Sequence, residues 1–547
     1  MVKDTNYAIP RAALFVAPNG SDRNRGTRKR PFRTVSAAIN AAKPGSTIVI
    51  RAGTYRESLP DLSKRLTLQA YPNEKVWLKG SIVVRGWVRE GRVWRKDDWR
   101  HSFCSDCFDV RNLDPEFPNA GLPEQVFVDG RPLKQVTSRS AVKRGTFFVD
   151  RVRRKLFVGT NPRGRTVEVS VHKTALVIWQ GGRGSVVRGL GFAHYSPVAQ
   201  PGLGGAIKGN AADLTFADNT IAWSAVKGLS IFAPNARVQG NTFVNNGMMG
   251  LSAWKADGLV LRGNRFLANN QEGFVQTGVI SEAAGAKLTS SRNLSITDNV
   301  FEGNRANGLW IDIDVSGVTI SRNVFKHNVR HGLFYEISSH GIIASNVMRK
   351  NKEAGIALSN ATHVRVYHNT IVGNRYGLLI QDDDRVNRDA LEIARGNTWV
   401  SGATTFRRNI VSTGGQKDGL LFWVRDYSGV LKAREMLTTS DDNAFYVPTL
   451  GGRIEWWDKR RVRKFDGLND FQLHTRRDKN SVLLSKNLAI SLHGRAGLNR
   501  ATMRGEFAGR LQPVPRDVVA AIGGGGRWDV VVGAVFMPLI DGGSDRK

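Results

Sequence analysis

The chain has 547 residues, 41% of them hydrophobic, with 58 glycines, 18 prolines and a formal net charge of +33. This composition suits a large core with many tight turns and argues against disorder. No apolar run approaches the roughly 20 residues that a transmembrane helix needs, so we expect no membrane span.

The strong positive charge would attract polyanions such as an acidic polysaccharide or a nucleic acid. However, the basic residues are scattered, as at 23–25, 151–155 and 459–464, and no helix-turn-helix, zinc-finger or RNA-recognition motif accompanies them. We therefore do not expect a nucleic-acid partner. Solubility in an unusual environment, or a moderately acidic glycan, explains the charge more easily.

Residues 1–80 are predicted to form an N-terminal cap and the first coils of a repeat. Residues 1–10 are polar, and the apolar stretch 12–17 is too short for a cleavable signal peptide. Residues 31–42 have the pattern of a short amphipathic helix, with Val35, Ala38, Ile39 and Ala42 on one face. Such a helix would cover the open end of a stack of repeats.

Residues 81–172 lack the repeat and contain hairpin-like runs at 126–130 and 147–158, which predict an inserted β-rich subdomain. This region also contains Cys104 and Cys107, with His101 nearby. A zinc site would need a fourth ligand, and a redox Cys-x-x-Cys would need a thioredoxin-like context. We therefore expect a local disulfide or two inert thiols.

Residues 173–412 carry a repeat in which an asparagine lies two residues before an apolar residue. The spacings are 22, 23, 35, 24, 23 and 23 residues, and from the second unit another asparagine follows five residues later. The seven repeats begin at Asn219, Asn241, Asn264, Asn299, Asn323, Asn346 and Asn369. A period near 23, with short alternating strands, predicts an all-β, right-handed parallel β-helix. The asparagines would stack inside the coil and satisfy buried backbone groups.

The single spacing of 35 predicts an extra loop at about 272–284. Insertions on one face of a solenoid usually lie at its binding side, so this loop is a candidate rim of an active site. After about residue 413 the period fades, and we assign residues 413–547 to C-terminal coils and a tail.

Aligning the coils on the glycine that opens one strand defines outward-facing columns. The first and third positions after the glycine are mostly apolar, so the second and fourth face outward, because side chains alternate along a strand. The second column holds Lys287, Trp310 and Phe334, and the fourth holds Phe232, Trp254, Thr289, Asp312 and Glu336. Aromatic rings beside carboxylates suggest a sugar-binding face, with aromatics under a covering loop as the alternative.

Asp312 and Glu336 are 24 residues apart in one column. Adjacent strands lie about 4.8 Å apart, so the two carboxyl groups should approach within about 5 Å, as in retaining glycosidases. Such proximity should raise one pKa and give an ionised nucleophile beside a protonated acid. A calcium site or ordinary surface acids are the alternatives.

Four neighbouring features could assist this pair. Asp314 could tune it or bind a hydroxyl, and Lys287 could keep Asp312 ionised, bind a hydroxyl or be an unrelated surface lysine. His340 could contact sugar or be a turn residue. The run Asp382–Arg385 favours a solvated turn over a calcium site.

Residues 282–288, 308–312 and 333–341 together resemble the β-helical β-xylosidases among the glycoside hydrolases. The resemblance implies that Asp312 is the nucleophile and Glu336 the general acid/base, and it adds Glu282 to the substrate-binding residues. Asp314 is an extra acid, and the turn before His340 is one residue longer than in that family. Both departures bear on the substrate more than on the chemistry.

Three classes of function stay open. The first is a retaining glycosidase acting on a plant- or microbe-derived glycan. The second is a lyase or epimerase acting on uronic acids, with Lys287 or His340 as base. The third is a non-catalytic glycan-binding protein. We expect a carbohydrate partner and no cofactor, with a structural or substrate-bridging calcium ion left open. A secreted or periplasmic location is favoured, with the cytoplasm still open.

Overall fold

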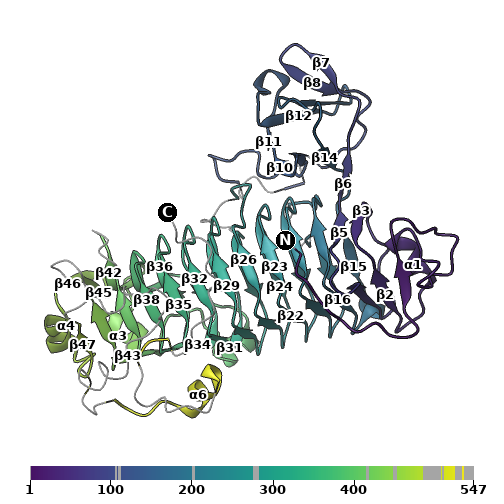
Figure 1. The fold of residues 1–547 in the computed structure, drawn as a ribbon. Helices are drawn as coiled ribbons and strands as arrows, with labels where there is room; N and C mark the ends of the chain where they lie inside the picture. The colour runs from purple at the N-terminus through teal and green to yellow at the C-terminus, as the bar shows by residue number, and fades with distance from the viewer. Residues whose placement is uncertain are drawn as a thin grey trace. The chain divides into compact units, whose positions relative to one another are not determined.

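The computed structural model describes residues 2–104, 107–108, 113–199, 204–274, 282–413, 418–446, 453–484, 507, 511–523 and 532–534. The chain forms two compact units, residues 1–253 with 267–284, and residues 254–266 with 285–547. In each unit, short strands pair in parallel with strands one coil further along, in three ladders (Figure 1). The predicted right-handed parallel β-helix is confirmed.

The asparagine repeat forms buried hydrogen-bonded ladders at the bends between strands. In the second unit, Asn299 Nδ2 donates to Asn323 Oδ1 (2.9 Å), and Asn323 Nδ2 donates to Asn346 Oδ1 (3.0 Å). Each amide also bonds backbone groups of its own and the adjacent coil, as Asn323 does with the Ile296 carbonyl (2.8 Å). Beside the ladder, Phe301 stacks on Phe325 with ring centroids 4.9 Å apart. These contacts repeat because the sequence does.

The first unit begins with a cap and continues as coils. Helix α1 (Val35–Ala41) starts at Thr34, whose Oγ1 accepts from Ala37 N (3.1 Å), and it buries Val35, Ala38 and Ile39, as predicted. The strands of the coils are β1 (Leu14–Val16), β2 (Thr47–Ile50), β4 (Thr67–Ala70), β16 (Val186–Arg188), β19 (Thr215–Ala217) and β22 (Arg237–Gln239) in one ladder; β3 (Gly53–Tyr55), β5 (Val76–Lys79), β17 (Gly191–Ala193), β20 (Thr220–Ala222) and β23 (Thr242–Val244) in the second; and β15 (Leu176–Ile178), β18 (Ile207–Gly209), β21 (Lys227–Ile231) and β24 (Met249–Trp254) in the third.

Between β5 and β15 the chain forms two further sheets, in which most neighbouring strands are antiparallel. Val126, Val128, Phe147, Leu156 and Val169 are buried in their shared core. Cys104 and Cys107 form a disulfide, one of the two expected states. One sheet comprises β10 (Arg131–Pro132), β9 (Val126–Val128), β14 (Val167–Ser170) and β6 (Ser81–Val83), and the other β11 (Lys134–Gln135), β12 (Thr146–Asp150), β13 (Lys155–Val158), β8 (Val93–Lys96) and β7 (Val88–Glu90).

The second unit continues the three-ladder pattern well beyond residue 413. The asparagine ladder runs on through Asn409 to Asn443, whose Nδ2 donates to Asp478 Oδ1 (2.9 Å). The strands are β25 (Val260–Arg262), β28 (Ser295–Thr297), β31 (Ser316–Ser321), β34 (Ser339–Ala344), β37 (Arg365–Tyr367), β40 (Thr404–Arg407) and β43 (Leu437–Asp441); β26 (Arg265–Leu267), β29 (Val300–Glu302), β32 (Val324–Lys326), β35 (Val347–Arg349), β38 (Thr370–Val372), β41 (Ile410–Ser412), β44 (Ala444–Tyr446) and β47 (Val482–Leu483); and β27 (Ala284–Thr289), β30 (Asn307–Asp312), β33 (Leu333–Glu336), β36 (Ala354–Ser359), β39 (Tyr376–Asp382), β42 (Leu420–Asp426), β45 (Ile454–Asp458) and the antiparallel β46 (Arg461–Phe465).

The helices of the second unit are short and lie outside the ladders. Helix α6 packs Val518 and Ile522 against Ala344 and Tyr367 of the coils. The helices are α2 (Ala390–Ala394), α3 (Ala433–Met436), α4 (Leu468–Thr475) and α6 (Arg516–Ile522). None of the helices in the described residues is long and apolar enough to cross a membrane.

Candidate active site

The candidate carboxylates end two adjacent strands of one sheet. Strand β30 pairs with β33 in the register Leu309–Leu333, Trp310–Phe334 and Ile311–Tyr335, so Asp312 and Glu336 follow at the next position of each strand. Leu309, Ile311 and Tyr335 point into the coil and are fully buried. Because the faces alternate, the two carboxyl groups lie on the opposite, outer face. They nevertheless have little exposure, 5% for Asp312 and 9% for Glu336.

Asp312 is held by a lysine. Lys287 Nζ, from β27, lies 2.9 Å from Asp312 Oδ2, and the same ammonium group lies 3.8 Å from the centroid of the Trp310 ring. Asp312 Oδ1 accepts a hydrogen bond from the Ile313 amide (2.9 Å). An ammonium ion and a peptide N–H therefore each contact one oxygen of the Asp312 carboxylate.

Glu336 is held by two donors from different parts of the chain. Arg385 Nη1 donates to Glu336 Oε1 (2.7 Å), and Trp310 Nε1 donates to Oε2 (3.1 Å). Burial and then the nearby charge of Asp312 raise the pKa of Glu336, while Arg385 and Lys287 oppose the rise. The net change is a rise in the pKa of Glu336, with burial as its largest cause.

Arg385 was missed by the sequence reasoning. It lies in residues 383–402, within the connection between β39 and β40 that contains α2. It also donates to Ser359 Oγ (3.2 Å) and Asn360 Oδ1 (2.9 Å) on the coils. The signal that could have found this segment is the distance from Asn369 to Asn409, which are ladder partners 40 residues apart. This spacing of 40 residues departs further from the usual period than the spacing of 35 that predicted the loop at 272–284.

The run Asp382–Arg385 is not the predicted solvated turn. Asp382 ends β39, is almost completely buried, and accepts a hydrogen bond from the Ser401 amide. Burial is the largest cause that raises the pKa of Asp382 to about 7. Asp383 accepts two hydrogen bonds from Arg385 Nε (both 2.9 Å). The run therefore fixes the base of the segment that carries Arg385.

Asp314 bonds side chains of residues 383–402 and makes no hydrogen bond to Glu336 among the described residues. Its Oδ1 accepts from Asn387 Nδ2 (2.8 Å) and Trp399 Nε1 (2.9 Å). Burial raises the pKa of Asp314, against the opposing hydrogen bond from Trp399. Asp314 thus anchors residues 383–402. The sequence had instead suggested that it tunes the carboxylate pair or binds a sugar hydroxyl.

The predicted aromatic platform is mostly covered. Trp310 and Phe334 are only 5% and 6% exposed, and their ring centroids lie 5.2 Å apart. Both rings lie on the outer face of the sheet, as expected. However, Lys287 and the Phe334 ring cover the indole of Trp310. Neither Trp310 nor Phe334 therefore offers an open face on which a sugar could stack. Trp254 is 46% exposed, with Lys255 Nζ 4.5 Å from its ring centroid.

Two other candidates make contacts of their own. His340 belongs to β34, in a different ladder, where its ring stacks on His363 (centroids 4.8 Å apart) and Nδ1 contacts Ser339 Oγ (2.9 Å). Its φ of 53° marks an irregular position near the start of this strand, not the turn of the alternative interpretation. Glu282, in the first unit, forms an ion pair with Lys227 (2.7 Å). Residues 275–281 of the predicted rim loop lie outside the described residues.

The described residues contain no group of three or more His, Cys, Asp or Glu side chains that could hold a metal ion. The two carboxylates of the pair are themselves bonded by Lys287 and Arg385. The arrangement places two carboxyl groups, in different surroundings, side by side on one outer face.

Sequence comparisons match parts of the chain. The family model described as periplasmic copper-binding protein (NosD) matches residues 275–391, and a family of unknown function, DUF1565, matches residues 18–62. The uncharacterized protein YwoF of Bacillus subtilis is 44% identical over 77 residues, covering 13% of this chain and 16% of YwoF. Pectate lyase PEL9 of Emericella nidulans is 36% identical over 80 residues, covering 13% and 20%. The chain therefore spans a fifth or less of these curated relatives.

Among solved structures, the complex of XylC with xylose superposes with a TM-score of 0.59 and 18% sequence identity, covering 83% of this chain and 89% of XylC. At this identity the likeness concerns the fold. It agrees with the strand ladders described above: the chain is a right-handed parallel β-helix, with the candidate carboxylates on two adjacent coils.

Proposed function

We propose that this protein is a retaining glycoside hydrolase, similar to a β-xylosidase, that acts on a plant- or microbe-derived oligo- or polysaccharide. The observation that carries the proposal is the pair Asp312 and Glu336, on adjacent rungs of one outer face. Rungs lie about 4.8 Å apart, near the roughly 5–5.5 Å between the carboxyl groups of retaining enzymes. Asp312 bonds Lys287 and a peptide amide, whereas Glu336 bonds Arg385 and an indole and has a raised pKa. These different surroundings support different roles for the two groups.

In the proposed reaction, the Asp312 carboxylate attacks the anomeric carbon while Glu336 protonates the departing glycosidic oxygen. The C–O bond breaks, and a covalent glycosyl–Asp312 ester forms. Glu336, now ionised, removes a proton from a water molecule that attacks the same carbon and releases Asp312. Esterification removes the negative charge of Asp312, which is one of the causes that raise the pKa of Glu336. The acid of the first step therefore becomes a base for the second.

The cations support these roles. Lys287 pairs with Oδ2 of the proposed nucleophile, and the Ile313 amide donates to its Oδ1, so both oxygens of Asp312 are held in place. Arg385 and Trp310 each bond one oxygen of Glu336, which fixes the plane of the carboxyl group. A positioned acid costs less reorganisation in the transition state than a mobile one.

A lyase or epimerase acting on uronic acids is the second candidate, favoured by the local identity with pectate lyase PEL9. Such a reaction needs a base to remove a proton next to a carboxylate. Lys287 is engaged as a cation with Asp312 at 2.9 Å, and His340 lies in another ladder against His363. These contacts make both proposed bases less suitable, so we rank hydrolysis first.

We also propose a secreted or periplasmic location. The Cys104–Cys107 disulfide is typical of oxidising compartments, and the family matched by residues 275–391 is described as periplasmic.

The proposal is tested with Asp312→Ala on a panel of aryl glycosides. We expect hydrolysis by the variant to fall by about 10⁴-fold or more, as for loss of a nucleophile. Added azide should restore turnover and give a glycosyl azide of inverted configuration. Asp384→Ala, which removes an exposed carboxylate outside the pair, is the control. Normal turnover by Asp312→Ala would contradict the nucleophile assignment, and an unsaturated, ultraviolet-absorbing product from the unmodified protein would identify a lyase.

A further inference from the structure

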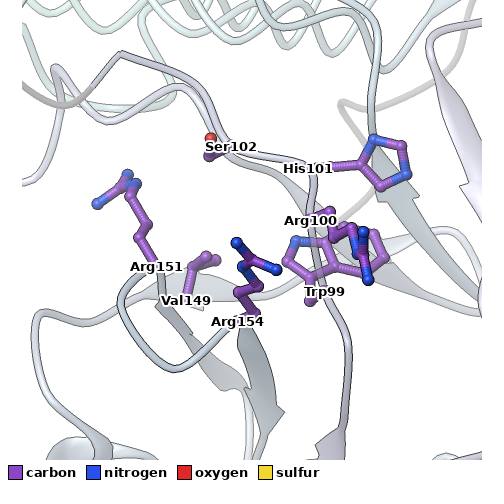
Figure 2. Close-up of a pocket in the computed structure, with 7 residues that line it drawn as sticks. All are labelled: Trp99, Arg100, His101, Ser102, Val149, Arg151 and Arg154. Carbon is purple, nitrogen blue, oxygen red and sulfur yellow. The ribbon is translucent and has the colours of Figure 1, made fainter.

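A hollow of about 240 Å³ lies in the antiparallel sheets of the first unit. One wall is the β12–β13 hairpin, which contributes Val149, Arg151 and Arg154, and the other is the segment 99–102 that follows β8 (Figure 2). This is the basic run at 151–155 that the sequence analysis left without a specific role. The candidate active site uses none of these residues.

The walls of the hollow are fixed by backbone contacts. Asp150 Oδ1 accepts from the Arg153 amide (2.8 Å), which shapes the turn between β12 and β13. The Trp99 amide donates to the Arg154 carbonyl (2.7 Å) and ties the turn to the facing segment. Trp99 itself is buried. The arginines therefore project from a preformed frame, which lowers the entropy cost of binding.

Cationic groups outnumber their carboxylate partners around the hollow. Arg100 Nε bonds Asp98 (2.8 Å), and Arg151 pairs with Glu124. The pKa of Asp98 is lowered, chiefly by the hydrogen bond from Arg100 and less by Arg154 at longer range. Within the described residues, no carboxylate lies within 4.0 Å of the Arg154 guanidinium. Arg151 Nε is likewise buried without a hydrogen-bond partner among the described residues.

We propose that this hollow binds the anionic group, carboxylate or sulfate, of one unit of an acidic polysaccharide. Guanidinium groups bind planar oxyanions through paired hydrogen bonds, and Arg154 has no such partner from the described chain. The volume is below the roughly 300–1,000 Å³ of drug-sized sites, which suits a single sugar unit. A nucleic acid would instead need a stripe of phosphate contacts along its backbone. The identification of the anion as a sugar rests on the proposed function.

The test measures binding to the full chain by calorimetry at low salt. The probes are a uronic-acid hexamer, its neutral counterpart, a sulfated oligosaccharide of equal length and a short single-stranded DNA. We expect a charged oligosaccharide to bind and the neutral one not to bind. Arg154→Gln should weaken that binding about tenfold, the effect of losing one charge-assisted pair. The charged oligosaccharide whose affinity falls in Arg154→Gln identifies the anion as a carboxylate or a sulfate.

Arg153→Gln is the matched control, because Arg153 lies in the same turn, is largely exposed and is outside the hollow. It should change the affinity less than about twofold. Equal losses of affinity in Arg153→Gln and Arg154→Gln would show that only diffuse positive charge binds the oligosaccharide, and would overturn the site. DNA binding with the same dependence on Arg154 would also overturn it. So would the absence of binding to every anion tested. If Asp312→Ala hydrolyses aryl glycosides normally while the unmodified protein binds the charged oligosaccharide through Arg154, only the proposed function is contradicted.

Discussion

Glu336 is a buried carboxyl group subject to opposing influences. Burial and Asp312 raise its pKa, and Arg385 lowers it through a direct ion pair at 2.7 Å. A buried acid between a carboxylate and a guanidinium is sensitive to the loss of either. The protonation state of the proposed acid therefore depends on a residue of a connecting segment, outside the strands that carry the pair.

Arg385→Gln should raise the pKa of Glu336 further, because the substitution removes the cation that opposes the rise. The alkaline limb of the pH profile of kcat/KM should then move to higher pH. A ¹³C-carboxyl NMR titration of Glu336 measures the same change without substrate. Arg388→Gln, on the same segment with an exposed side chain, should leave both unchanged. A fall in the pKa of Glu336 in Arg385→Gln would contradict the assigned electrostatics.

Asp382→Asn should stabilise the protein at neutral and alkaline pH. The pKa of Asp382 is about 7 in the fold against 3.8 for the ordinary group, so the folded state binds the extra proton between these values. Stability of the unmodified protein therefore declines as pH rises through this window. The advantage of the variant should grow between pH 5 and pH 8 to roughly 2–4 kcal/mol.

Unfolding midpoints in urea at both pH values measure this difference. Asp384→Asn, an exposed neighbour, is the control and should follow the unmodified protein. If the stabilities of Asp382→Asn and the unmodified protein changed with pH in the same way, ionisation of Asp382 would not destabilise the fold, and the prediction would be wrong.

At the scale of the elements, the asparagine ladders hold successive coils in register. Asn323 is buried, donates to the Ile296 carbonyl (2.8 Å) and to Asn346 Oδ1 (3.0 Å), and accepts from the Asn299 amide (2.9 Å). Removing one rung leaves several buried polar groups on both neighbours unpaired, which costs more than a single hydrogen bond.

Asn323→Ala should therefore destabilise the second unit by roughly 3–5 kcal/mol, with about 1–3 kcal/mol for each group left unsatisfied. Differential scanning calorimetry should show a lower Tm. Asn40→Ala, at an exposed position of α1, should be nearly neutral. An unchanged Tm for Asn323→Ala would mean that water enters the bend and replaces the amide.

At the scale of the whole molecule, the net charge of +33 has a stability cost. Many surface arginines and lysines repel one another, and surface ion pairs such as Lys464–Glu455 (3.2 Å) recover little of that energy. The charge also suits the proposed binding of an acidic polysaccharide, since a positive field concentrates anions near the surface.

Raising NaCl from about 20 mM to about 300 mM, which shortens the Debye length from about 20 Å to about 6 Å, should therefore raise the Tm. Calorimetry at fixed pH measures the trend, with sucrose of equal osmolality as the control for effects other than screening. A Tm that falls with salt would show that ion pairs outweigh the repulsion.

The sequence by itself determined the β-helix, its asparagine ladders and the alternation that puts Asp312 and Glu336 on the outer face, because each depends on a local period that repeats along the chain. Only the tertiary structure decided that Arg385, 49 residues after Glu336, reaches it, that Asp314 anchors the segment carrying Arg385, and that Trp310 is covered. Those outcomes depend on how a long connection without a period folds back onto the coils, and no spacing in the sequence encodes that path.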